Sequence, residues 1–232
     1  LGLDISSTAI KVVELEKSGN NFRLLHYSIE SLPQNAVSEN SIHDVEQVSS
    51  SITRAIKRSG ARSRNVATAI PGSHVISKRI FMPHGLREDE LESQITLEAD
   101  HYIPYPLDEV NMDFEVLGPA AESPNEDEIL LVACRKEIVD DYIAVLEDAG
   151  LTPAILDVEY FAVENAYQQI VQDLPGGGME KLTAVMDFGA TTLHVNVIQD
   201  NRSIYTRNHS FGGNQLTEEI QRRYGLSLEE AV

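Results

Sequence analysis

The chain has 232 residues, 42% hydrophobic and 24% charged, which is enough to bury one large core or two smaller ones. Its 18 Lys and Arg against 37 Asp and Glu give a formal net charge of −19. That charge argues against a duplex nucleic-acid binder and against adhesion to an anionic membrane, because both need cationic surfaces. No run approaches the roughly 18 apolar residues of a membrane span, and no signal peptide is visible. We therefore expect a cytoplasmic protein with no direct membrane insertion.

The first seventy residues predict the start of an α/β unit. Three antiparallel strands are expected at residues 2–5, 9–17 and 22–32. The next segment predicts a helix that ends at Gly60 and has one apolar face, made of Val45, Val48, Ile52 and Ile56. The run NVATAIP, residues 65–71, predicts a further buried strand.

Residues 74–150 have a different pattern and predict a compact α+β insert. Strands are expected at 74–83, 109–118 and 128–135, with an acidic loop before the last of them. One helix should start near Glu88, with its inward residues at Leu91, Ile95, Ala99 and Tyr102, and a second should cover 137–149. Cys134 is the only cysteine and lies in an apolar run, so a disulfide framework is excluded and we expect a buried thiol.

The pattern of the first unit returns after the insert. Residues 153–160 predict a strand that rejoins the first unit, 161–171 predict a helix, and the Gly-rich run at 175–181 predicts a boundary. Three more strands at 182–189, 190–199 and 202–211 precede a helix with Leu216, Ile220 and Tyr224 spaced four apart. The order of strand, Asp-containing turn, strand, strand and helix thus occurs twice, and this repeat is the most informative feature of the sequence.

Two short polar turns occupy corresponding positions in the two repeats, DISST at 4–8 and DFGATT at 187–192. Alone, the first would more often be an ordinary Ser/Thr turn than a phosphate site. The repeat changes that balance, because two facing turns could both direct backbone N–H groups at one triphosphate. The side chains expected to help bind it are Ser6, Ser7, Thr8, Lys11, Thr191 and Thr192.

The remaining residues of these turns suggest how a metal ion and the phosphates would be accommodated. Asp4 and Asp187 carry the same charge as phosphate, so we expect them to hold Mg²⁺ through water, which Mg²⁺ gives up reluctantly. The small residues Gly189 and Ala190 leave room for the backbone to approach the phosphates.

These motifs resemble the superfamily of actin, the heat-shock chaperones and the sugar kinases. The seven-residue step from Asp4 to Lys11 fits the first phosphate motif of its actin-like branch, although Ser6 stands where many members have Gly. The segment LDVEYFAVENA fits the connecting segment, which implies Glu159 as a water-orienting residue. Its position alone equally suits a helix-start glutamate near the helix dipole. SFGGNQLTEEI resembles the stretch after the second phosphate motif and adds Gly212 and Gly213 to the nucleotide site.

The α+β insert indicates which branch of this superfamily the chain resembles. An α+β block at this place resembles the extra subdomain of FtsA cell-division proteins. The segments GLDISSTAIKVVEL, LEADHYIPYPLDEVNMDFEVLGP and MDFGATTLHVNVI together resemble the PilM family of type IV pilus assembly proteins, over essentially the whole chain. This implies an α/β fold of actin-like (RNase H-like) subdomains with an FtsA-type insert. The first subdomain would be 1–73 with 151–178, the insert 74–150, and the start of a truncated second lobe 179–232.

The resemblance also implies a function. The protein would be an ATP- and Mg²⁺-binding scaffold with at most weak ATPase activity, peripheral to the inner membrane and involved in pilus biogenesis and twitching motility. It would dock on the cytoplasmic tail of PilN and relay nucleotide state to other platform or motor proteins. A small-molecule kinase of the same superfamily and an FtsA-type division protein are the alternatives. Loss of a downstream half would leave the adenine without its pocket, so we expect both phosphate motifs to be present in an incomplete ATP and Mg²⁺ site. It would also expose apolar surface and invite self-association.

Overall fold

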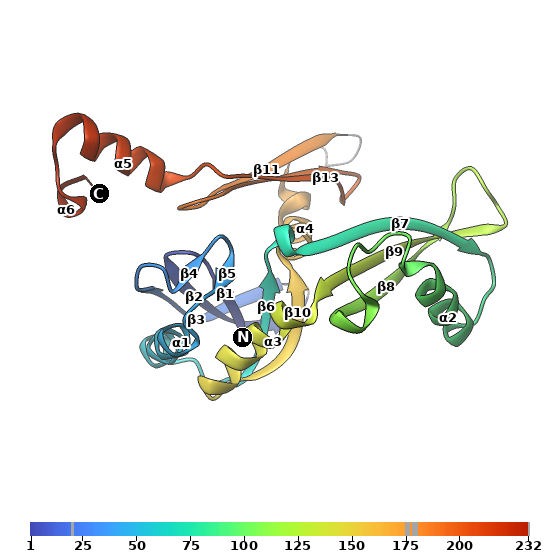
Figure 1. The fold of residues 1–232 in the computed structure, drawn as a ribbon, viewed down its shortest axis with the longest axis horizontal. Coiled ribbons are helices and arrows are strands. Elements are labelled where there is room, and N and C mark those ends of the chain that lie inside the picture. Colours follow the sequence, from blue (N-terminus) through green and yellow to red (C-terminus); the bar gives the residue numbers. More distant parts are fainter. Residues whose placement is uncertain (20, 175–176, 178–180, 232) are drawn as a thin grey trace. The chain divides into compact units, whose positions relative to one another are not determined.

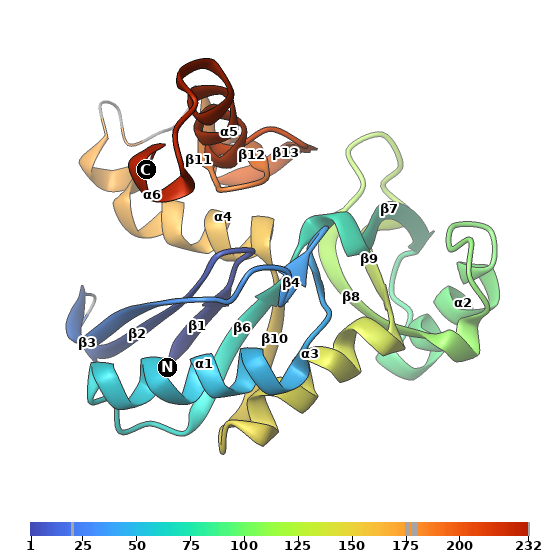
Figure 2. The same ribbon diagram turned by 60° about the vertical axis from the view of Figure 1, so that its left-hand side comes forward.

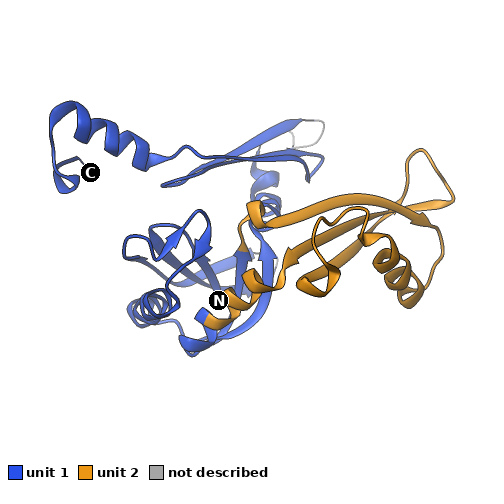
Figure 3. Ribbon diagram, viewed as in Figure 1, with its two compact units in different colours: residues 1–69, 145–232 blue, residues 70–144 orange. Residues whose placement is uncertain are grey.

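The computed structural model describes residues 1–19, 21–174, 177 and 181–231. Figure 1 shows the elements along the chain, and Figure 2 shows the same ribbon from a second direction. The chain forms two compact units, residues 1–69 with 145–232 and residues 70–144 (Figure 3). The subdomain limits expected at residues 73, 150 and 178 stay predictions. The Gly-rich boundary expected at 175–181 falls mostly outside the described residues.

The first unit contains a five-stranded sheet in the order β10–β6–β1–β2–β3 (Figure 2). The predicted meander is confirmed, because β1 (Gly2–Ile5), β2 (Ala9–Ser18) and β3 (Asn21–Ser31) pair antiparallel. The two further strands predicted for this unit are confirmed: β6 (Asn65–Ile70) pairs parallel to β1, and β10 (Thr152–Val158) lies beside β6. The two-residue strands β4 (Val37–Ser38) and β5 (Ser41–Ile42) are too short to leave a pattern and were not predicted.

Helix α1 (Val45–Ser59) packs against β2 and β3. The Asp44 side chain accepts a hydrogen bond from the Gln47 N–H at its start, and Gly60 ends it in the left-handed conformation with φ 74°. Val48, Ile52 and Ile56 are buried, as their spacing predicted. Val45 is the first helical residue and is 37% exposed.

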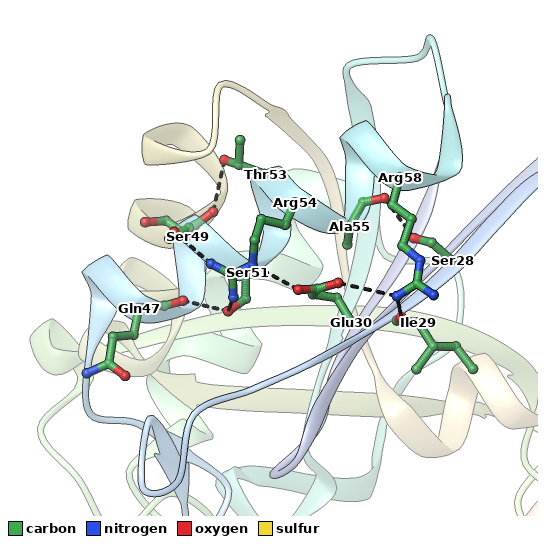
Figure 4. Close-up of polar contacts among 11 residues, drawn as sticks. Ser28, Ile29, Glu30, Gln47, Ser49, Ser51, Thr53, Arg54, Ala55 and Arg58 are labelled. Carbon is green, nitrogen blue, oxygen red and sulfur yellow. Dashed lines mark hydrogen bonds and ion pairs between the residues drawn. The ribbon is translucent and has the colours of Figure 1, made fainter.

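Polar contacts fix α1 over the edge strand β3 (Figure 4). Ser28 donates a hydrogen bond from Oγ to the Ala55 carbonyl over 2.7 Å. Arg54 Nε donates to Glu30 Oε1 over 2.8 Å, and Arg58 Nη1 donates to the Ile29 carbonyl over 3.3 Å. The hydrogen bond from Arg54 is the main reason that the pKa of Glu30 lies below its ordinary value.

The other face of β2 and β3 carries large exposed apolar side chains. Val13 and Leu15 alternate with the buried Val12 and Glu14 along β2, so they point away from α1. Tyr27 on β3 pairs with Val13. The exposed apolar residues of these two strands are Val13, Leu15, Phe22, Leu24, Leu25, Tyr27 and Ile29.

The second repeat has the predicted order of elements. Strands β11 (Leu182–Phe188), β12 (Leu193–Gln199) and β13 (Arg202–His209) form an antiparallel sheet. Helices α5 (Gly213–Tyr224) and α6 (Leu228–Ala231) follow (Figure 1).

Helix α4 (Glu159–Ile170) connects β10 to the second repeat and packs against β12 and β13. Its contacts with this sheet include several hydrogen bonds. The Tyr167 hydroxyl donates to Thr183 over 3.1 Å, and Asn196 Nδ2 donates to the Tyr160 carbonyl over 3.1 Å. The Ser203 N–H donates to Glu164 Oε2 over 2.7 Å.

The second unit has its own core, and its predicted strands and helices are confirmed. Strands β7 (Val75–Pro83), β8 (Val110–Pro119) and β9 (Glu126–Arg135) form an antiparallel sheet in the order β7–β9–β8. Residues of α2 (Glu88–Ala99) pack on one face of it, and α3 (Lys136–Asp148) follows β9. Cys134 is buried, and Tyr102, just beyond α2, is partly buried against the core. Among the described residues, no helix is both long and apolar enough to cross a membrane.

Glu14 is a buried carboxylate that holds the loop between α1 and β6. It accepts hydrogen bonds from the backbone N–H groups of Arg62 over 3.2 Å and Ser63 over 3.0 Å. His26 Nε2 lies 3.9 Å from its Oε2. The hydrogen bond from the Ser63 N–H is the largest influence on the Glu14 pKa, and it lowers this pKa below the ordinary value of 4.5. The hydrogen bond from Arg62 and the charge of His26 act in the same direction, whereas burial acts against them.

We predict that Glu14→Gln lowers the free energy of unfolding by about 1–2 kcal/mol at pH 7, because hydrogen bonds to a charged acceptor are lost. The folded-state pKa is depressed, so this contribution is full above pH 4.5 and is lost as the pH falls through the folded pKa. Urea denaturation between pH 3 and 8 measures it. Glu16→Gln, which removes an exposed pair with Arg23, is the control and should change stability by less than about 0.5 kcal/mol. Equal effects of the two substitutions would show that the hydrogen bonds to the Glu14 carboxylate do not stabilise the fold.

Candidate functional site

The turns after β1 and β11 have the same hydrogen-bonded geometry. The Ser6 N–H donates to the Ala9 carbonyl, and the Gly189 N–H donates to the Thr192 carbonyl, each over 3.0 Å. Ile5 pairs with Ile10 as Phe188 pairs with Leu193. Residues 4–11 therefore correspond one to one to residues 187–194, so the repeat extends to the register of the two hairpins.

The two turns meet. Thr191 Oγ1 donates a hydrogen bond to Ser7 Oγ over 3.3 Å, although the two residues are 184 positions apart. Lys11 Nζ lies 2.9 Å from Asp4 Oδ2, its cross-strand neighbour. Both side chains are about half exposed, so this ion pair contributes little to stability. Its significance lies in the position of the two charges beside the turns.

The charge environment of Lys11 brings further predicted residues into the site. Burial lowers the pKa of the Lys11 ammonium, but the hydrogen bond to Asp4 and the negative charges of Asp4, Asp187 and Glu159 outweigh it and raise the pKa above its ordinary value. Carboxylates from β1, β11 and the start of α4 thus all act electrostatically on one ammonium, and Asp4 contacts it directly. The predicted residues assembled here are Asp4, Ser7, Lys11, Glu159, Asp187 and Thr191.

The start of α5 holds the second turn in place. The Gly213 N–H donates to the Gly189 carbonyl over 3.0 Å, and the Asn214 N–H donates to the Ala190 carbonyl over 2.8 Å. A Cβ atom on Gly212 would lie 2.4 Å from the Ala190 carbonyl oxygen. A Cβ atom on Gly189 would lie 2.8 Å from the Thr192 carbonyl oxygen. Gly189 and Gly212 are therefore required by close packing within the turn, and contact of Gly212 and Gly213 with a nucleotide stays a prediction.

The three remaining predicted hydroxyl residues are Ser6, Thr8 and Thr192, and they differ in exposure and hydrogen bonding. The Ser6 hydroxyl donates to the Ala9 carbonyl over 2.9 Å and so stabilises the first turn itself. Thr8 is exposed, and its carbonyl accepts a hydrogen bond from the Leu32 N–H over 2.8 Å. Thr192 is half-buried. Their roles as ligands stay predictions.

Sequence analysis missed two residues that belong to this constellation. His194 Nδ1 lies 3.8 Å from Glu159 Oε2 and 2.9 Å from Asn208 Oδ1. His194 follows Asp187 by the same seven residues that separate Lys11 from Asp4, so the repeat could have identified it. Asn208 lies opposite His194 on β13, and only the strand register reveals this.

The donor set suits a magnesium-bound phosphate chain. It offers an ammonium, hydroxyls from both turns and two carboxylates. In the described part of the chain, no group of three or more His, Cys, Asp or Glu side chains could hold a metal ion directly.

Comparisons with known proteins agree with this architecture. Residues 2–232 match the sequence model of the family described as Type IV pilus assembly protein PilM. The structure is similar to that of the PilM–PilN type IV pilus biogenesis complex, with a TM-score of 0.83 and 28% identity over 99% of this chain and 67% of that chain.

A second similar structure is the ethanolamine utilization protein EutJ from Carboxydothermus hydrogenoformans. Its TM-score is 0.54, with 15% identity over 99% of this chain and 58% of that chain, and this likeness concerns the fold alone. The predicted α/β, actin-like ATPase fold is confirmed. The chain spans only part of the length of both relatives.

We predict that Gly212→Ala destabilises the second turn, because the new methyl group would overlap backbone atoms of Ala190. Overpacking of this kind costs about 1–3 kcal/mol. Gly213→Ala is a matched control, since its Cβ would meet the Gly189 carbonyl oxygen at an ordinary 3.9 Å. Thermal unfolding and amide hydrogen exchange of residues 189–192 measure the effect. Similar exchange in the two variants would show that the close approach at Gly212 does not hold the turn.

Proposed function

Because the chain belongs to the PilM family of type IV pilus assembly proteins, we propose that it is an ATP-binding, actin-like scaffold of the pilus inner-membrane platform. The observation that carries this proposal is the meeting of two equivalent hairpin turns, beside which Lys11 pairs with Asp4 and feels the charges of Asp187 and Glu159. The exposed ion pair between Lys11 and Asp4 adds little to stability, so folding alone does not account for these charges beside the turns.

Different residues of the site would bind the phosphates, the metal ion and the water molecule. Lys11 would turn its ammonium from Asp4 towards the phosphates, and Ser7 and Thr191 would offer hydroxyls from opposite turns. Asp4 and Asp187 would hold Mg²⁺ through its waters. The bound Mg²⁺ neutralises the phosphate charge, and Glu159, at the start of α4, would orient a water molecule for weak ATPase activity.

The same geometry suggests how nucleotide state would be relayed. Ser7 lies in the turn between β1 and β2 and Thr191 in the turn between β11 and β12, and their hydroxyls are 3.3 Å apart. A ligand that contacts both turns would favour one spacing of the two sheets over another, and this differential affinity is what shifts a conformational equilibrium.

The partner proposed for this scaffold is the cytoplasmic tail of PilN. Support comes from the similarity to a solved PilM–PilN complex, of which this chain covers 67%. Docking on that tail would keep the protein in the cytoplasm beside the inner membrane. Contacts with other platform or motor proteins, a role in twitching motility and self-association stay predictions. The exposed apolar residues of β2 and β3 are compatible with self-association.

We predict saturable binding of Mg-ATP in a calorimetric titration, and at least tenfold weaker binding for Asp187→Ala, a loss of about 1.4 kcal/mol or more. The reason is that Asp187 would hold the metal ion through water. Glu16→Gln, on the exposed part of β2, should bind like the wild type. Equal affinities of wild type and Asp187→Ala would remove Asp187 from the site, and the absence of wild-type binding would contradict the nucleotide assignment.

We also predict that a peptide of the PilN cytoplasmic tail binds and that Mg-ATP changes its affinity. Coupling is reciprocal, so the peptide must change the affinity for Mg-ATP by the same factor. Two titrations, each with the other ligand absent or saturating, measure it, with a scrambled peptide as control. Binding of both ligands without any mutual effect would contradict the relay while leaving the docking intact.

A further inference from the structure

The charges of the chain are unevenly distributed along its sequence. Residues 47–87 contain no Asp or Glu, although the whole chain has 37 of them against 18 Lys and Arg. The end of α1 and the loop after it form an exposed basic surface, made of Arg54, Lys57, Arg58, Arg62 and Arg64. The net charge of −19 argues against membrane adhesion by the chain as a whole, but it does not describe this surface.

The cations of α1 share one face of the helix. Arg54, Lys57 and Arg58 are spaced by three and four residues, which places them on the same side. Arg54 and Arg58 both pair with Glu30 of β3, over 2.8 and 3.6 Å (Figure 4). One carboxylate thus faces two guanidinium groups, and this face keeps a net positive charge. Cations in a last helical turn also suit the helix dipole, so these residues alone would not indicate a binding surface.

The loop after α1 carries two further cations, Arg62 and Arg64, that the helix dipole does not explain. Its backbone is fixed, because the Arg62 N–H donates to Glu14 over 3.2 Å and the Arg64 carbonyl accepts from the Thr152 N–H over 2.8 Å. Among the described residues, the side chains of Lys57, Arg62 and Arg64 have no ion-pair or hydrogen-bond partner. A rigid backbone therefore presents cations that the fold itself does not use.

We propose that the basic surface binds the phosphate groups of anionic phospholipids, so that this side of the chain lies against a membrane. Clusters of exposed Lys and Arg are attracted to anionic headgroups. These cations are spread over a helix face and a loop rather than gathered around one buried polar group, which suits a plane of headgroups better than a single small ligand. The same membrane would repel the acidic remainder of the chain and so orient the basic surface towards it.

This inference extends the proposed function, in which the PilN tail holds the chain beside the inner membrane. Attachment to the tail would keep the basic surface at a high effective concentration near the headgroups, so two weak contacts would act together. Because the loop backbone is already fixed by Glu14 and β10, lipid binding would order only the side chains.

The test is sedimentation of the chain with vesicles of phosphatidylethanolamine and phosphatidylglycerol, and separately with vesicles of phosphatidylcholine. We expect binding to the anionic vesicles only, and its loss at about 1 M salt, where the screening length is about 3 Å. The triple variant Lys57→Gln, Arg62→Gln, Arg64→Gln should bind at least about tenfold more weakly. Its thermal unfolding should match the wild type, because these side chains have no partner among the described residues.

The matched control removes the same number of exposed cations elsewhere, by Lys78→Gln, Arg202→Gln and Arg207→Gln. It should bind the anionic vesicles like the wild type. Equal binding of the two triple variants, or equal binding of the wild type to anionic and neutral vesicles, would overturn the inference.

Two further outcomes separate this inference from its alternatives. Salt-sensitive self-association in light scattering without lipid, abolished in the Lys57, Arg62 and Arg64 variant, would assign the basic surface to acidic residues of a second copy and overturn the inference. The vesicle assay contains neither PilN nor ATP. Vesicle binding without binding of the PilN tail would therefore contradict the proposed docking and support the inference, whereas binding of the tail without vesicle binding would do the reverse.

Discussion

The register of two antiparallel hairpins is the constraint on which the candidate site depends. In each hairpin the closing pair, Ile5 with Ile10 and Phe188 with Leu193, fixes a turn whose N–H donates to the carbonyl three residues on. A shift of one residue would move every side chain to the opposite face of its sheet. It would take the Asp4 and Asp187 carboxylates away from the turns. The buried faces of the strands, which hold Ile10 and Val12 against α1, therefore also determine where the charges of the site lie.

The second turn needs more support than the first. Ser6 stabilises its own turn, because its hydroxyl donates to the Ala9 carbonyl. Gly189 has no side chain to do so, and the carbonyl groups of Gly189 and Ala190 are bound instead by N–H groups in the first turn of α5. This satisfies helix N–H groups that otherwise have no intrahelical partner. It also explains the glycine at 212, because any larger residue would separate α5 from the turn that it holds.

Much of this could be predicted from the sequence, for identifiable reasons. The strands and helices follow from periodicity, and the repeat identified Asp4, Lys11, Asp187 and Thr191 as neighbours of two equivalent turns. Residues whose role depends on tertiary contact could not be found in this way. Asn208 is an ordinary polar residue of a strand until the register places it opposite His194. The packing of Gly212 on Ala190 likewise depends on the direction in which the chain leaves β13, and no local pattern encodes it.

The helices that pack on the two sheets are held by different forces, and this bears on how the site would respond to a ligand. Helix α1 buries Val48, Ile52, Ala55 and Ile56, whereas Tyr167 is the one residue of α4 that is buried. Helix α4 is held instead by hydrogen bonds such as those of Tyr167, Asn196 and Glu164. Each such bond contributes about 1 kcal/mol, less than a buried Ile or Val.

Regions with few buried apolar contacts open at lower free energy than the rest of a protein. The sheet under α4 can therefore adjust more readily than the sheet under α1. Glu159 is the first residue of α4 and lies beside His194 of that sheet. A small displacement of the helix would thus change the distance between this carboxylate and the imidazole. The part of the site that would orient water is consequently the part most sensitive to movement between the two repeats.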